Sequence, residues 1–138
     1  MTGREAAVTR FAGLWSGGAL IDYFYNYQLN VMSVTIRAIE ATKRELEKYV
    51  QFGIDLYKGN PCYVPPLVFD DVNTLLPEKN PAFEICEAQS FMAYRNGKPV
   101  GRITGIINRM LNEKSGRKEA RFGFVDFTDD KEVCDALF

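Results

Sequence analysis

Hydrophobic and polar residues alternate along four segments of the chain, which is typical of β-strands with one buried face. The first segment covers residues 34–38. The next two, residues 88–94 and 99–108, flank the dipeptide Asn96-Gly97, which is a strong signal for a tight hairpin. The fourth covers residues 120–127. The pattern therefore predicts a first strand, followed later by a three-stranded antiparallel meander.

A helical period replaces the alternation after the first strand. Thr42 and Glu45 have the spacing of a capping box. Apolar residues follow at the spacing of one helix face, namely Leu46, Tyr49, Val50, Gly53, Ile54 and Tyr57. Gly59-Asn60-Pro61 ends this helix, because glycine or asparagine suits a left-handed cap and proline cannot continue the helix. Residues 62–83 are rich in proline and predict an irregular segment, with one short helical turn at residues 72–76.

The strongest strand prediction is Arg121–Phe127, whose apolar residues on both faces suggest burial on both sides. Thr128, Asp129 and Asp130 then form an acidic turn, and Asp129 with Glu132 is expected to cap a last helix. That helix reaches Phe138 after too few residues to be stable alone, because isolated helices below about 12–15 residues are marginal. We therefore expect a fragment truncated in its last helix, with marginal stability and an exposed sheet edge prone to self-association.

The predicted order is β-α-(irregular)-β-β-β-α, with residues 109–119 as a polar loop. This order indicates an α+β fold with a mainly antiparallel sheet over residues 32–138. Residues 1–31 look different, because an apolar run of 11 residues, 11–21, contains three glycines. It is too short to span a bilayer. We interpret residues 1–31 as an extension that is poorly ordered or adds a strand or helix, and our hypothesis is that Met32 is the natural start.

Composition and charge narrow the classes of function. A net charge of −1 and a pI near 5.5 give no general attraction to nucleic acid or anionic membranes, so neither partner is expected. The absence of histidine excludes Ser-His-Asp and Cys-His nucleophile pairs. Cys62, Cys86 and Cys134 lack metal-ligand spacing, which predicts no metal site and reduced thiols in a cytoplasmic protein.

Several stretches together resemble one enzyme family. They are DLYKGNP at 55–61, YVPPL at 63–67, NPAF at 80–83, GKPVGRI at 97–103, GIIN at 105–108 and RFGFVDF at 121–127. In these stretches the chain resembles the N-terminal half of GNAT-type N-acetyltransferases, in particular a Bacteroidetes-like bacterial group of GNAT-like proteins. The resemblance covers residues 32–138 and implies a partial GNAT-like (acyl-CoA N-acyltransferase) fold. The family order is a first strand, one or two helices, a three-strand meander and a helix whose N-terminus faces the coenzyme.

The resemblance implies an acyl-CoA-dependent N-acetyltransferase that uses acetyl-CoA and an amine acceptor. In that family the last of these strands offers backbone groups to the pantetheine arm, which points to Phe124, Val125, Asp126, Phe127 and Thr128. The turn after it normally reads Q/R-x-x-G-x-G/A, whose amides hold the pyrophosphate. Residues 128–132, TDDKE, contain no glycine, and their carboxylates oppose an anion. The fragment is therefore expected to be inactive alone, and a non-catalytic binding or assembly module on the same fold is the alternative.

A second alternative comes from the central motif of RNA-recognition domains, which residues 120–127 resemble. The resemblance implies that Phe122 and Phe124 stack on bases from one open sheet face. The first strand has no aromatic residue, and about 70 residues, too many for that compact domain, separate Phe52 from Phe122.

Weaker candidates for chemistry flank the strands. Glu84 and Glu87 could serve as a general base for an amine, although a solvated strand end explains them as well. Arg109, Lys114, Arg117 and Lys118 give a locally basic loop, which we interpret as a solvated hairpin loop. Cys134 is expected to pack in the core.

Overall fold

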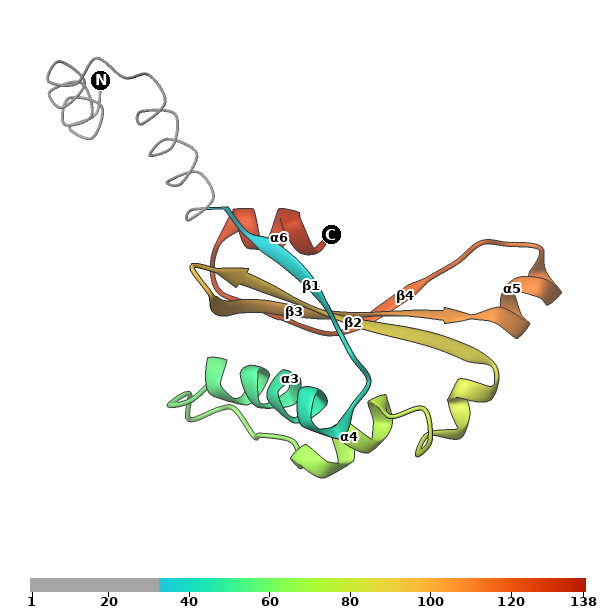
Figure 1. The fold of residues 1–138 in the computed structure, drawn as a ribbon, viewed down its shortest axis with the longest axis horizontal. Coiled ribbons are helices and arrows are strands. Elements are labelled where there is room, and N and C mark those ends of the chain that lie inside the picture. Colours follow the sequence, from blue (N-terminus) through green and yellow to red (C-terminus); the bar gives the residue numbers. More distant parts are fainter. Residues whose placement is uncertain (1–32) are drawn as a thin grey trace, which may run out of the picture. The chain divides into compact units, whose positions relative to one another are not determined.

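The computed structural model describes residues 33–138, of which Val34–Phe138 form one compact unit. The predictions for residues 1–31 and for Met32 lie outside the described residues. The elements follow one another along the chain as β1 (Thr35–Ile39), α3 (Lys43–Leu56), α4 (Val68–Leu75), η1 (Pro81–Glu84), β2 (Cys86–Arg95), β3 (Lys98–Asn108), α5 (Arg109–Ser115), β4 (Arg121–Phe127) and α6 (Lys131–Leu137) (Figure 1).

The four strands form one antiparallel sheet in the order β1-β2-β3-β4. The predicted α+β class and the antiparallel meander are thus confirmed. Asn96 and Gly97 have φ values of +53° and +74°, as the two central residues of a type I′ hairpin turn require. In this sheet β4 is an edge strand, so one of its sides is not paired with any strand of residues 33–138.

Helices cover both faces of the sheet. Figure 1 shows α3 and α4 on one face and α6 on the other. The main core lies beneath α3 and α4, where helix residues meet side chains of β1 and β2; it consists of Ile39, Leu46, Tyr49, Val50, Val72, Leu75, Leu76 and Met92. On the other face, Val133 of α6 is fully buried. A Cβ at Gly101 would lie 2.9 Å from the Val133 and Leu137 side chains, so α6 packs directly on the β3 backbone.

The beginning and end of α3 follow the sequence signals. The Thr42 hydroxyl accepts a hydrogen bond from the Glu45 amide at 3.4 Å, as the capping box predicts. Its buried residues include Leu46, Tyr49, Val50 and Gly53, which are four of the six predicted core positions. Of the other two, Ile54 is half-buried and Tyr57 is exposed. Gly59 has a φ of +91°, which agrees with a left-handed residue just after the helix.

A β-bulge interrupts the pairing of β3 with β4. Arg102 lies opposite Asp126, but Thr104 lies opposite Gly123, so Ile103 faces two residues, Phe124 and Val125. Phe124 has a φ of +51°, a left-handed conformation that is uncommon for a bulky residue. The extra residue reverses the alternation of faces along β4.

The bulge overturns two predictions for β4. Phe124 packs against Tyr49 on the α3 face, with ring centroids 6.4 Å apart. Phe122 packs instead against Phe138, next to α6, with centroids 5.1 Å apart. The rings thus occupy opposite faces, whereas the RNA-recognition resemblance implies that both share one. Burial on both sides was also wrong, because Arg121 and Phe122 are exposed.

Two loop predictions also need correction. Residues 109–115 form the helix α5, because the Asn108 side chain caps its first turn by accepting a hydrogen bond from the Leu111 amide at 2.8 Å. The last helix is capped by Asp130, whose carboxylate accepts from the Glu132 amide at 3.0 Å, whereas Asp129 is exposed. The sequence offers two adjacent aspartates, and the path of the chain after β4 selects the second.

Candidate functional site at the carboxyl end of β4

The five residues that the family resemblance assigns to coenzyme binding lie in the second half of β4 and just beyond it. Phe124 and Asp126 face α3, and Phe127 lies opposite Gly101 on the α6 side. The Thr128 amide and hydroxyl both donate to the Val100 carbonyl, at 2.9 and 3.3 Å. The side chains therefore point to both faces, and what the five residues share is the backbone of an edge strand.

A buried ion pair lies beneath this part of β4. The Arg102 guanidinium donates from Nε and Nη2 to one Asp126 oxygen, at 2.7 and 2.6 Å. The Arg102 side chain is 7% exposed and the Asp126 side chain 15%. Arg102 also donates to the Tyr49 carbonyl of α3 at 3.0 Å. It lies 5.2 Å from the Tyr49 ring centroid and 5.7 Å from that of Phe124, so it joins α3 to the bulge.

Gly53 makes room for this guanidinium. A Cβ at Gly53 would lie 2.2 Å from Nη2 and 2.4 Å from Cζ of Arg102. Glycine inside a helix normally costs stability relative to alanine. The close approach of Arg102 explains why the helix has a glycine on its buried face.

A chain of hydroxyl groups continues from the ion pair into the core. The Tyr49 hydroxyl lies 2.7 Å from Thr104 Oγ1, which in turn lies 2.8 Å from Ser90 Oγ. The Tyr49 hydroxyl also donates to the Phe124 carbonyl at 3.4 Å. Burial raises the pKa of Tyr49 to about 12, against the opposing effect of its hydrogen bond with Thr104. The phenol is therefore a neutral donor near neutral pH and fixes the carbonyl of the bulged residue.

Acidic and aromatic groups surround the outer end of the ion pair. A hydrogen bond with the Asp126 carboxylate raises the pKa of Tyr57, which stacks on Tyr63 with centroids 4.9 Å apart. Burial raises the pKa of Asp71, and the positive charge of Arg102 opposes that shift. One cation and two carboxylates thus lie close to the carboxyl end of β4.

The N-terminus of α6 already holds a carboxylate. Asp130 caps the helix and forms an ion pair with Arg95, which also binds Glu132. The pKa of Asp130 is lowered, chiefly by its hydrogen bond with Arg95. The amides that would hold a pyrophosphate in the family pattern are therefore occupied by a side chain of this protein.

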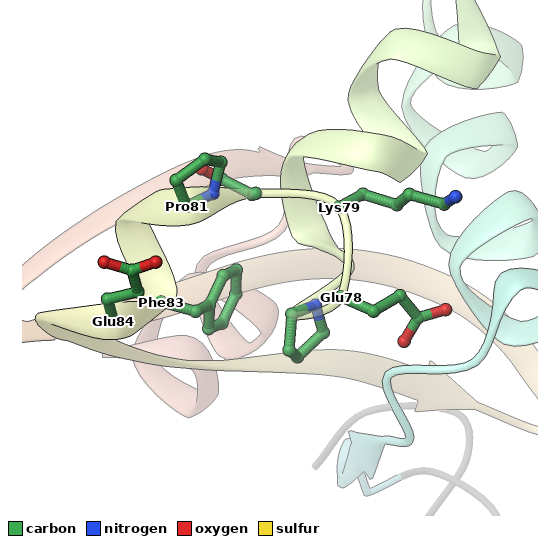
Figure 2. A pocket seen from close by; sticks show the side chains of 7 residues that line it. Glu78, Lys79, Pro81, Phe83 and Glu84 are labelled. Atoms are coloured by element: carbon green, nitrogen blue, oxygen red, sulfur yellow. The ribbon is translucent and has the colours of Figure 1, made fainter.

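Two hollows lie away from β4. The larger, of about 440 Å³, is an open depression lined by Pro77, Glu78, Lys79, Asn80, Pro81, Phe83 and Glu84. Figure 2 shows that the Lys79 ammonium and the Glu84 carboxylate point away from each other, so these charges do not converge on one ligand. The smaller, of about 90 Å³, is lined by Ile39, Glu40, Ala41, Leu46, Leu75, Ala88, Gln89 and Ser90.

Within residues 33–138, no group of three or more His, Cys, Asp or Glu side chains is placed to hold a metal ion. The helices of the same region are all too short or too polar to cross a bilayer. Of the remaining predicted residues, Glu87 pairs with Arg109 at 2.6 Å and Cys134 is half-buried on α6.

Sequence reasoning missed the polar side of this site. Arg102, Thr104 and Ser90 were not singled out, and Tyr49 was predicted only as a core residue. A signal was available, because Arg102 and Thr104 alternate with Gly101 and Ile103 along an otherwise apolar strand. Polar residues at inward positions of a central strand indicate a buried polar network.

Comparison with known proteins gives two relatives. The chain is 36% identical over 96 residues to Protein YghO of Escherichia coli (strain K12), and this match covers 70% of the chain but 24% of that protein. It is 33% identical over 98 residues to the bacterial ceramide synthase of Caulobacter vibrioides (strain NA1000 / CB15N), covering 70% of the chain and 26% of the relative. The chain therefore spans about a quarter of the length of these curated relatives. No family profile and no solved structure matches it.

Proposed function

We propose that this chain is the N-terminal part of an acyl-CoA-dependent N-acyltransferase with a GNAT-like fold, in which the free edge of β4 binds the pantetheine arm of the coenzyme. The carrying observation is the bulge at Phe124 on an edge strand. It lies within residues 124–128, the segment that the family resemblance assigns to the coenzyme. The order of strands and helices is the one that the resemblance predicts, with α5 added between β3 and β4.

An edge strand presents backbone N–H and C=O groups that pair readily with an added extended chain. The pantetheine arm is such a chain, since it is extended and contains two amide groups. The bulge interrupts the ladder with β3, and there the Phe124 carbonyl accepts a hydrogen bond from the Tyr49 hydroxyl instead. The outer side of β4, which pairs with no strand of residues 33–138, offers the backbone groups for a ligand. A left-handed non-glycine residue costs about 1–3 kcal/mol and persists only where its surroundings impose it. Here Tyr49 and Arg102 hold the Phe124 ring and carbonyl.

The name of one relative supports the same class of reaction. A ceramide is an amide of a long-chain amino alcohol and a fatty acid, so a ceramide synthase forms an amide bond. An N-acetyltransferase also forms an amide bond from an amine. In the proposed reaction the nitrogen lone pair attacks the thioester carbonyl, the C–S bond breaks, and the amine proton leaves with the coenzyme thiol. Reduced cysteines and an acyl-CoA substrate both fit the proposed cytoplasmic location.

Nuclear magnetic resonance can test the binding edge on the isotope-labelled chain. Adding acetyl-CoA should shift the amide signals of residues 124–128, whereas those of β1, at the opposite edge, should stay unchanged. Adenosine 3′,5′-bisphosphate lacks the pantetheine arm and should leave the β4 signals in place. Shifts confined to β1 or α6, or equal shifts with both ligands, would refute the assignment of β4. Thiol release from acetyl-CoA and longer acyl-CoAs by the full-length protein, with amines as acceptors, tests the reaction itself.

A non-catalytic module on the same fold is the second candidate, and the occupied N-terminus of α6 favours it. Asp130 fills the amides that would hold a pyrophosphate, and Arg95 neutralises that carboxylate. Isothermal titration with acetyl-CoA separates the two candidates. Binding of acetyl-CoA by the full-length protein supports the transferase. If neither the chain nor the full-length protein binds acetyl-CoA, the non-catalytic module is favoured.

A further inference from the structure

Exposed aliphatic side chains gather at the end of the sheet where β3 passes into α5. Met110 and Leu111, in the first turn of α5, are 43% and 50% exposed. Ile107 at the end of β3 is also exposed, and Ile85 lies next to it because its carbonyl accepts a hydrogen bond from the Arg109 amide at 2.9 Å. We call residues 107–121 the β3–β4 tip. Figure 1 shows α5 at the far end of the long strands, beyond the helices α3 and α4.

The β3–β4 tip is basic although the whole chain is slightly acidic. Residues 109–121 contain five lysines and arginines but two glutamates, against a net charge of −1 for the whole chain. Arg109 and Arg117 form ion pairs with Glu87 and Glu119. The three remaining cations, Lys114, Lys118 and Arg121, form no ion pair with any described residue.

Helix geometry places one of these cations beside the aliphatic pair. Lys114 follows Met110 by four positions and Leu111 by three, and residues at these spacings share a helix face. An exposed aliphatic patch bordered by lysine is the arrangement by which peripheral helices bind an anionic lipid surface. Apolar groups enter the boundary between headgroups and acyl chains, and lysine side chains reach the lipid phosphates.

The chemistry of the tip favours lipid over nucleic acid. Proteins that bind single-stranded nucleic acid rely on aromatic side chains that stack on bases. Residues 107–121 contain no aromatic residue. A second exposed apolar site gives a useful contrast. Leu67 and Phe69 are 61% and 62% exposed, but Asp70 and Asp71 follow them directly. Carboxylates at that position repel an anionic surface, so apolar exposure alone does not distinguish the tip.

We propose that the β3–β4 tip docks on an anionic phospholipid surface, with Met110 and Leu111 inserted among the headgroups and Lys114 and Lys118 paired with lipid phosphates. The expectation of no membrane partner rested on the net charge of the whole chain, whereas residues 109–121 concentrate positive charge at one end of the sheet. This proposal does not depend on acyl transfer, and its test does not use the coenzyme.

Co-sedimentation with vesicles tests the proposal on the full chain. The protein should sediment with vesicles of phosphatidylcholine and phosphatidylglycerol but not with phosphatidylcholine alone, and added salt should release it. Replacing both aliphatic residues, as M110S/L111S, should lower the partition coefficient on the order of ten-fold. Lys114→Gln and Lys118→Gln should each lower it about five-fold. The control L67S/F69S removes two still more exposed apolar side chains beside carboxylates and should leave binding unchanged.

Three results would overturn the proposal. One is an absence of sedimentation with either vesicle, and another is equal sedimentation with both. The third is binding that M110S/L111S leaves intact, which would assign the contact to another part of the chain, such as the apolar run at residues 11–21. Binding to single-stranded RNA that depends on Lys114 and Lys118, without binding to vesicles, would assign the tip to nucleic acid. Circular dichroism of each variant confirms that the fold is retained.

Discussion

Replacing Arg102 by methionine should strongly destabilise the fold. Methionine keeps most of the length of the side chain but removes its charge and its hydrogen bonds. Asp126 would then keep a negative charge at 15% exposure, without the partner that now lies 2.6 Å away. The Tyr49 carbonyl of α3 would also lose a donor at 3.0 Å.

The expected loss is about 3 kcal/mol of unfolding free energy, because breaking a buried pair by removing one partner costs about 3–5 kcal/mol. The lower end applies here because Asp126 still reaches solvent. A domain of this size typically has about 5–15 kcal/mol of stability, so the loss is large but measurable. Adding Asp126→Leu to Arg102→Met should restore all but about 1 kcal/mol, since an apolar pair of similar volume often replaces a buried ion pair at little cost.

Urea unfolding followed by circular dichroism measures these free energies. Arg109→Met is the matched control, because Arg109 pairs with Glu87 at the same distance of 2.6 Å but both side chains are at least half exposed. Its expected cost is below about 1 kcal/mol. The reasoning is refuted if Arg102→Met costs no more than Arg109→Met, or if adding Asp126→Leu makes the protein still less stable.

Three further predictions concern single positions. Gly53→Ala should destabilise the protein, because the new Cβ would displace the Arg102 guanidinium. In an ordinary helix the same change stabilises by about 1 kcal/mol. Urea unfolding shows whether the free energy of unfolding falls or rises. Tyr49 should ionise near pH 12 in the folded state, as followed by tyrosinate absorbance. Because the pKa of Tyr49 is higher in the folded state than the usual value of 10, the neutral phenol contributes fully to the free energy of unfolding below pH 10. That contribution, roughly 2–3 kcal/mol, should be lost as the pH rises to 12. Tyr49→Phe should abolish this loss. Asp130→Ala should lower the thermal unfolding midpoint, whereas Asp129→Ala should not, since Asp130 caps α6; equal effects would contradict this cap.

The sequence predicted local features of the fold well. The limits of β4, the Asn96-Gly97 turn and the Thr42 cap depend on residues within a few positions of one another, and each agrees with the structure. The helix α5 was missed because its seven residues are polar apart from Met110 and Leu111, so it has no buried face to give a helical period.

The candidate site was only partly predictable. The resemblance pointed to residues 124–128, but the side chains that hold this segment come from α3 and β3. Perfect alternation placed Phe122 and Phe124 on one face, and a single bulged residue separated them. A bulge depends on the register of two strands, and that register cannot be predicted from the sequence of either strand alone.

The sequence by itself determined the order of the four strands with α3 and α6, the antiparallel meander and the basic character of residues 109–121, because these follow from periodicity, turn chemistry and charge along the chain. The tertiary structure alone decided that Arg102 pairs with Asp126 against α3, that Asp130 rather than Asp129 caps α6, and that aliphatic residues join the cations at the β3–β4 tip. The pairing of Arg102 with Asp126 and that of Asp130 with Arg95 require different strands to meet at a definite register, which only packing of the whole fold fixes. At the tip, the formation of α5 brings Met110 and Leu111 beside Lys114.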